Sequence, residues 1–171
     1  LAALAPHRPK DVLDAAQELD DDWDRATVLV ALAPYRPEAA FAAAPELDDS
    51  KARAKVLAAL VQHVPRQARS VVLDQALTAA RALDSDYDHA QVLATLAPYQ
   101  PEAVLAAARE IHSHYPRATV LATLAPHVSE QKRELVLDQA WAATQVLNDS
   151  EARARVLTAL TPHVSQQERE L

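Results

Sequence analysis

Arginine recurs at one position of a repeating pattern, and it is the residue type in this chain best suited to bind a charged partner. A guanidinium group presents a planar fork of donors that matches carboxylate and phosphate oxygens. Acidic residues precede the arginines in most copies, as Asp48 and Asp49 do. The row predicts either an anion-binding surface or, as the recurring acids favour, arginines that pair with the acidic turns. It consists of Arg25, Arg53, Arg117 and Arg153, with His89 in one copy.

A second row places a ring after a recurring proline, which Gln62 replaces in one copy. Such a row could bind a peptide or a metal, or the rings could pack on the next repeat. Histidine near a helix C-terminus is also stabilised by the helix dipole. Helix pairs repeat at about 10 Å, too far for two imidazoles to share one ion. The rings are His7, Tyr35, His63, Tyr99, His127 and His163. Together with the four arginines, the candidate partner-binding residues are Tyr35, Tyr99, His63 and His127.

Catalytic and metal chemistry find little support. His112 and His114 could ligate a metal, but no third ligand is assured. The aspartate-rich turns lack the glycine-bearing spacing of a calcium loop. Serine, histidine and aspartate recur evenly, whereas catalysis needs an asymmetric convergence of nucleophile, base and orienting group. We therefore expect no catalytic residue, no metal, no cofactor and no enzyme activity.

Composition excludes further classes. The chain has no glycine and no cysteine, which excludes a phosphate-binding glycine loop, a disulfide and a thiolate metal site. Its net charge is -7 without a basic stripe, which argues against nucleic acid and an anionic membrane as partners. No apolar run is long enough for a transmembrane helix, and a cytoplasmic location is expected. Arginine greatly outnumbers lysine, a bias typical of GC-rich bacterial genomes.

An internal repeat supplies the elements that position these rows. Residues 29–39 return at 93–103, and 72–76 at 136–140, so the shift is 64 residues. Fixed-period self-similarity marks stacked supersecondary units. The recurring phrase is Val-Leu-x-x-Leu-Ala-Pro, which we call the anchor phrase. Its first leucine falls at Leu1, Leu29, Leu57, Leu93, Leu121 and Leu157, so short units of 28 residues and long units of 36 alternate over most of the chain. The N-terminal hexapeptide matches this repeat and is interpreted as repeat, not as a signal peptide.

Each unit predicts two helices. The anchor helix, for example 24–33, has an apolar face, starts at a capping residue such as Ser50 or Ser150, and stops before the recurring proline. The intervening helix opens with Pro-Glu in short units and covers about eleven residues, as in 101–111; in long units it covers 129–147. Pro45 predicts a kink or early stop. The core must consist mostly of leucine, valine and alanine.

A third row of small residues follows the anchor helices. Small side chains either allow close helix approach or leave a shallow groove, and the sequence does not separate the two. The row is Ala31, Ala59, Thr95, Thr123 and Ala159, with Thr27 and Thr119 nearby.

These helix pairs, with their apolar leucines and alanines and proline-marked turns, resemble the α-solenoid superfamily of tetratricopeptide, HEAT and armadillo arrays. They look most like the Ala/Leu/Pro-rich repeats of large bacterial signalling proteins. That resemblance implies a sensor or partner-binding part. The expected fold is all-α, a right-handed α-solenoid of antiparallel helix pairs spanning residues 1–171 as a single array.

The leading hypothesis is a scaffold that binds a protein or peptide, with the anchor helices lining the concave face. Neither end has the polar face of a capping repeat, so we expect a segment of a longer array, with self-association through uncapped ends. One alternative is a structural spacer that stacks end to end. Others are a metal protein or enzyme built on the histidines, and an engineered repeat, against which irregularities such as Pro45 argue.

Overall fold

The computed structural model describes residues 1–163, which form ten α-helices and four 3-10 turns with no strand. The chain divides into two compact units, Leu1–Leu83 and Asp84–Leu171. The expected all-α class is confirmed. Along the described part of the chain, no helix combines the length and the apolar character needed to cross a membrane.

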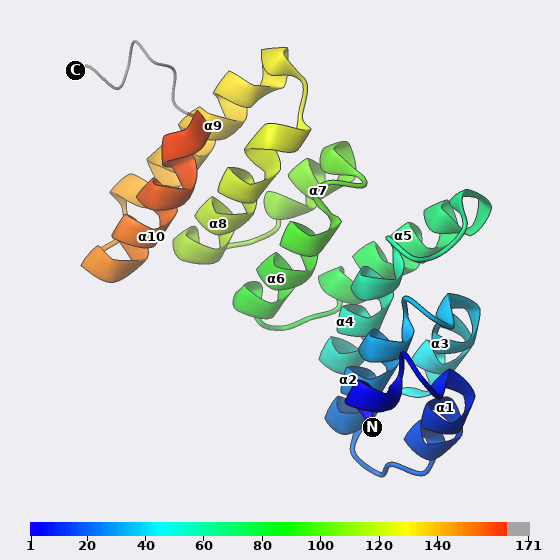
Figure 1. The fold of residues 1–171 in the computed structure, drawn as a ribbon. Helices are drawn as coiled ribbons and strands as arrows, with labels where there is room; N and C mark the ends of the chain where they lie inside the picture. The colour runs from blue at the N-terminus through cyan, green and yellow to red at the C-terminus, as the bar shows by residue number, and fades with distance from the viewer. Residues whose placement is uncertain (164–171) are drawn as a thin grey trace. The chain divides into compact units, whose positions relative to one another are not determined.

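Unit 1 contains two anchor helices in one layer and three intervening helices in a second (Figure 1). The anchor helices α2 and α4 pack side by side, and α5 packs against α4 as its antiparallel neighbour. The elements are the 3-10 turn η1 (Ala2–Leu4), α1 (Pro9–Gln17), α2 (Asp22–Leu32), α3 (Pro37–Ala43), the 3-10 turn η2 (Ala44–Glu46), α4 (Ser50–Leu60) and α5 (Arg66–Arg81).

Unit 2 contains three anchor helices in a row, with α8 packed between α6 and α10 (Figure 1). The intervening helices α7 and α9 cover the other side of this row, and α9 packs most extensively on α8. The elements are α6 (Asp86–Leu96), α7 (Pro101–Ala108), α8 (His114–Leu124), the 3-10 turn η3 (Ala125–His127), α9 (Glu130–Gln145), α10 (Ser150–Leu160) and the 3-10 turn η4 (Thr161–His163).

Helix bounds in the two units correspond closely. Both bounds of α6 lie 64 residues after those of α2, and the same offset relates α8 to α4, α9 to α5 and α10 to α6. The exception is α3, which ends at Ala43, one residue earlier than its counterpart α7. Pro45 lies in the 3-10 turn that follows α3, and its missing N–H cannot continue the helix. The early stop expected at Pro45 is confirmed.

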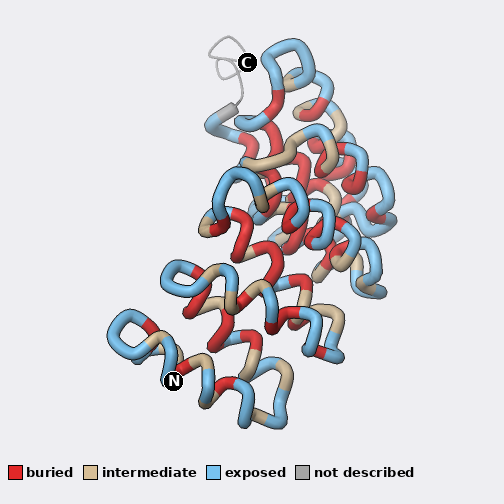
Figure 2. The backbone as a smooth tube through the Cα atoms, turned by 90° about the vertical axis from the view of Figure 1, so that its right-hand side faces the viewer, coloured by how far each residue is buried: buried red, intermediate tan, exposed pale blue. Residues whose placement is uncertain are grey.

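The core is built from repeated leucines, valines and alanines of the anchor helices. In α6 the buried stripe contains Val92, Leu93 and Leu96 at helical spacing. Figure 2 shows buried and exposed segments alternating along the helices, as amphipathic helices require. Each fully buried leucine contributes about 1.5–3 kcal/mol relative to an exposed one, so this stripe supplies most of the stability that short helices lack on their own.

Two local expectations were wrong by a few residues. The caps of α4 and α10 are Asp49 and Asp149, and Ser50 and Ser150 are the first helical residues. Asp49 has an extended backbone and its carboxylate accepts the Ala52 N–H at 2.7 Å, so aspartate supplies the cap one residue earlier.

The intervening helix α7 covers eight residues instead of the expected eleven. Beyond Ala108, the N–H groups of Arg109, Glu110 and Ile111 bond to carbonyls three residues back, at 3.0–3.4 Å. The last turn is therefore tightened in the 3-10 manner that is common at helix ends.

Candidate functional site

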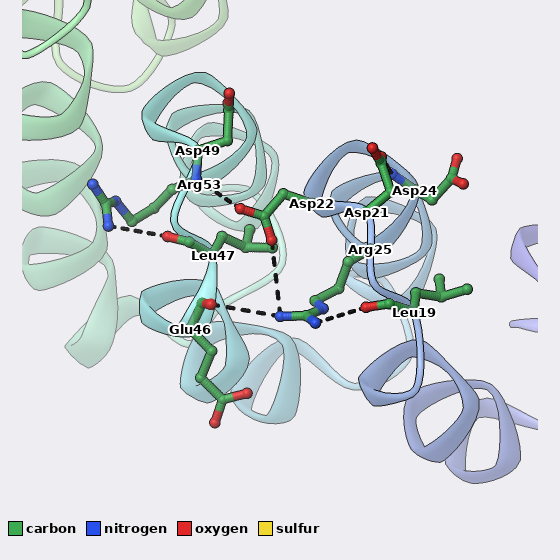
Figure 3. Close-up of polar contacts among 9 residues, drawn as sticks. All are labelled: Leu19, Asp21, Asp22, Asp24, Arg25, Glu46, Leu47, Asp49 and Arg53. Atoms are coloured by element: carbon green, nitrogen blue, oxygen red, sulfur yellow. Dashed lines mark hydrogen bonds and ion pairs between the residues drawn. The ribbon is translucent and has the colours of Figure 1, made fainter.

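Arg25 joins two loops of unit 1. Its Nη2 donates to the carbonyl of Leu19 at 2.7 Å and its Nη1 to the carbonyl of Glu46 at 3.5 Å. Nη1 also lies 3.9 Å from the Asp22 carboxylate, in an ion pair whose side chains are only about one-fifth exposed. Figure 3 shows the guanidinium between the loop before α2 and the turn before α4. Arg25 is thus committed to intramolecular partners.

The same bond recurs in other copies. Arg53 donates to the Leu47 carbonyl at 3.1 Å, and Arg153 donates to the Leu147 carbonyl at 2.6 Å. In all three cases the acceptor lies six residues before the arginine, at the end of the preceding loop. Arg117 occupies the same helical position in α8 and is half-buried. The main partners of this row are backbone carbonyls, and an ion pair to the acidic turn accompanies only Arg25 among the contacts described above.

A carboxylate joins successive anchor helices within each unit. Asp22, the first residue of α2, accepts the backbone N–H of Asp49 at 2.7 Å, and Asp86 of α6 accepts that of Ser113 at 2.7 Å. Hydrogen bonds from Ser113, chiefly its side chain and then its backbone, lower the pKa of Asp86, because they favour the charged carboxylate. We call this contact the aspartate clasp. It fixes the starts of paired anchor helices at one level.

The ring row lies at the opposite end of the anchor helices. Tyr35 follows the C-terminus of α2 and is about half exposed, while Tyr99 is half-buried after α6. His63 is half-buried and His127 is exposed. Ten residues separate Arg25 from Tyr35, which is about 15 Å along a helix. The two predicted rows therefore do not converge on one site. His7 is exposed, and the side chain of His163 lies outside the described residues.

Aromatic residues at the start of the anchor helices form a site that the sequence reasoning missed. They occupy the second helical position: Trp23 in α2, Tyr87 in α6 and Tyr115 in α8. Lys51 and Lys55 of α4 place their ammonium nitrogens 5.1 and 5.2 Å from the Trp23 ring centroid, within cation–π range. Aligning the chain on helix starts, instead of on the anchor phrase, would have revealed this column.

A groove lies between α6 and α8 in unit 2. Its volume is about 400 Å³, and its walls carry no charged side chain. Tyr87 is 54% exposed. The hydroxyl of Thr95 donates to the Gln91 carbonyl at 3.1 Å, and that of Thr119 to the Tyr115 carbonyl at 2.9 Å. The lining residues are Tyr87, Ala90, Gln91, Ala94, Thr95, Tyr115, Pro116 and Thr119.

The small-residue row thus contributes to a groove in unit 2, since Thr95 and Thr119 both line it. Their hydroxyl groups are already satisfied by carbonyls of their own helices, so these threonines offer chiefly small apolar surface. Of the two readings of the small row, a shallow groove is the one that applies at these two positions.

A second cavity, of about 410 Å³, lies between α8 and α10 and shares Tyr115 with the groove. Here Arg155 pairs with Glu151, one turn earlier on α10. Hydrogen bonds to Glu151 first and to Tyr115 second raise the pKa of Arg155. Tyr115 therefore stands between an open groove on one side and a charged pair on the other.

Unit 1 has a cavity of about 560 Å³ beside α4 and α5, lined in part by Arg53, Asp74 and Thr78. The Thr78 hydroxyl bonds to the Asp74 carbonyl at 2.8 Å, and Arg53 is engaged with Leu47. No aromatic ring lines this cavity.

Among residues 1–163, no three histidine, aspartate or glutamate side chains gather closely enough to hold a metal ion. His112 and His114 accordingly lack a third ligand within that range.

Comparison with protein-family models, with curated proteins and with solved structures yields no match. The site must therefore be interpreted from its own geometry.

Proposed function

We propose that this chain is a helical-repeat scaffold that binds a protein or peptide segment in the groove between α6 and α8. The observation that carries the proposal is the open, uncharged groove with Tyr87 on one wall and Tyr115 on the other. Tyrosine offers large contact area at little conformational cost, and aromatic residues are enriched where proteins bind one another.

The proposed architecture is a right-handed α-solenoid in which units of 28 and 36 residues alternate. The 64-residue offset of the helix bounds supports it. Within unit 2, successive anchor helices pack more closely on one another than α7 packs on α9. A layer with closer spacing lies on the inside of a curve, which supports an anchor-helix surface on the concave side. Extended concave surfaces are what such arrays use for binding.

A sensor or partner-binding role in a bacterial signalling protein fits this scaffold and the resemblance of its repeats. The arginine row is a weaker candidate surface than the groove, because three of its four members already bond to loop carbonyls. The ring row, Tyr35, His63, Tyr99 and His127, remains a prediction for a second contact surface.

Selection of random peptides displayed on phage against the immobilised protein tests the proposal. Enriched peptides should bind the purified protein in solution. Ala94→Trp, which fills the groove with an indole from a half-exposed position, should abolish that binding. Ser70→Trp places the same side chain at an exposed position of α5 and should leave binding intact. An absence of enrichment, or peptides indifferent to Ala94→Trp, would overturn the proposal.

A further inference from the structure

Aromatic rings at the second position of the anchor helices meet a cation from the next anchor helix. In unit 1, Lys55 is the sixth residue of α4 and lies over Trp23, the second residue of α2. In unit 2, Arg155 is the sixth residue of α10 and hydrogen-bonds Tyr115, the second residue of α8. The pairing thus occurs once in each unit, with different residue types.

Tyr87 breaks this pattern. It is the second residue of α6, but the sixth residue of α8 is Thr119, which carries no charge. Among the described residues, cation–π contacts are made by Lys51 and Lys55 with Trp23, and none involves Tyr87. The ring is 54% exposed and borders the groove of about 400 Å³. The place that a cation fills in unit 1 is therefore open here.

The charge around Tyr87 favours a cation over an anion. Asp84, Asp86 and Asp88 surround it in the chain, and the Ser113 N–H holds Asp86 in its charged form. The positive end of the α6 dipole amounts to only about half an elementary charge, which three carboxylates exceed. The whole chain, at -7, attracts a basic segment as well.

We infer that the groove between α6 and α8 binds a basic peptide segment, with a lysine or arginine side chain of that segment placed over the Tyr87 ring. The inference rests on the proposed function and adds the chemistry of the partner. The apolar walls formed by Ala90, Ala94 and Pro116 would take the neighbouring apolar side chains.

The probe is a short rhodamine-labelled peptide of alternating arginine and leucine, titrated by fluorescence anisotropy. Its control carries citrulline, a neutral isostere, in place of arginine. The arginine peptide should bind at least about 5-fold more tightly than the citrulline peptide, as expected for a cation over an aromatic ring. Equal binding of the two peptides would overturn the inference.

Variants locate the cation. Tyr87→Phe keeps the ring and should retain affinity within about 2-fold, while Tyr87→Leu should lose about 5-fold. Thr119→Lys supplies an internal ammonium, as Lys55 does for Trp23, and should lose at least about 5-fold. Ser70→Lys adds the same charge at an exposed position of α5 and should have little effect. Unchanged affinity in both Tyr87→Leu and Thr119→Lys would contradict the inference.

The two proposals fail differently. If Ala94→Trp abolishes binding of both peptides while Tyr87→Leu changes neither, the groove binds a partner but the cation site is wrong. If neither the two peptides nor any selected peptide binds, both proposals are wrong.

Discussion

The guanidinium of Arg25 donates a 2.7 Å hydrogen bond to the carbonyl oxygen of Leu19, six residues before it in the chain. The bond ties the first turn of α2 to the loop that precedes it. Since Arg53 and Arg153 repeat it, a residue that sequence alone recommends for anion binding serves to shape the turns in at least three copies.

Arg25→Ala should destabilise unit 1. The change removes two hydrogen bonds from a charged donor and leaves Asp22 without its ion pair, which should cost about 1–2 kcal/mol. Arg25→Lys should recover only part of this loss, because one ammonium cannot reproduce the planar fork. Urea unfolding followed by circular dichroism measures the difference. Arg66→Ala, at the exposed start of α5, is the control. Equal midpoints for Arg25→Ala and Arg66→Ala would contradict the structural role.

Asp86→Ala should destabilise unit 2 in a pH-dependent way. The folded-state pKa of Asp86 lies below the ordinary value of about 3.9, so its contribution is present above that pH and is lost as pH falls through the lower folded-state pKa. The gap between wild type and variant should be about 1 kcal/mol at pH 7 and should shrink below about pH 4. Urea unfolding across this range tests it, with exposed Asp138→Ala as control. A gap that stays constant down to pH 2.5 would contradict the clasp.

Sequence reasoning predicted the helices because their ends are written in residue types. Proline ends α2 and begins α3, and aspartate caps α4, so the bounds came within a few residues. It could not predict the arginine contacts, because the acceptors are backbone carbonyls and these carry no residue signature. It also missed the aromatic column, because Lys51 and Glu151 occupy the same helical position as Trp23, Tyr87 and Tyr115. There the geometry repeats while the residue type does not.

Removing the two lysines over Trp23 should create a second cation site in unit 1. In the Lys51→Met, Lys55→Met variant the indole loses its internal ammonium groups while the aliphatic bulk remains. With Trp141→Phe as background, the arginine–leucine peptide should change Trp23 fluorescence in the variant and leave the parent unchanged. A response in the parent as large as in the variant would show that the lysines do not occupy the ring.

Light-scattering mass against concentration separates a scaffold from a spacer that stacks end to end. The scaffold account predicts a constant mass near 18.6 kDa. A mass that climbs with concentration would favour stacking through repeat faces, and peptide binding would then have to be measured below the concentration at which the mass begins to rise.

Ring NMR of the four tyrosines tests the central claim most directly. Tyr87 and Tyr115 line the groove, whereas Tyr35 and Tyr99 follow the C-terminal ends of α2 and α6. With ring-13C tyrosine, and signals assigned through four Tyr→Phe variants, the arginine–leucine peptide is titrated to saturation. The account predicts that the Tyr87 and Tyr115 signals shift while those of Tyr35 and Tyr99 stay in place. Shifts confined to Tyr35 and Tyr99 would contradict it and would assign binding to the ring row instead.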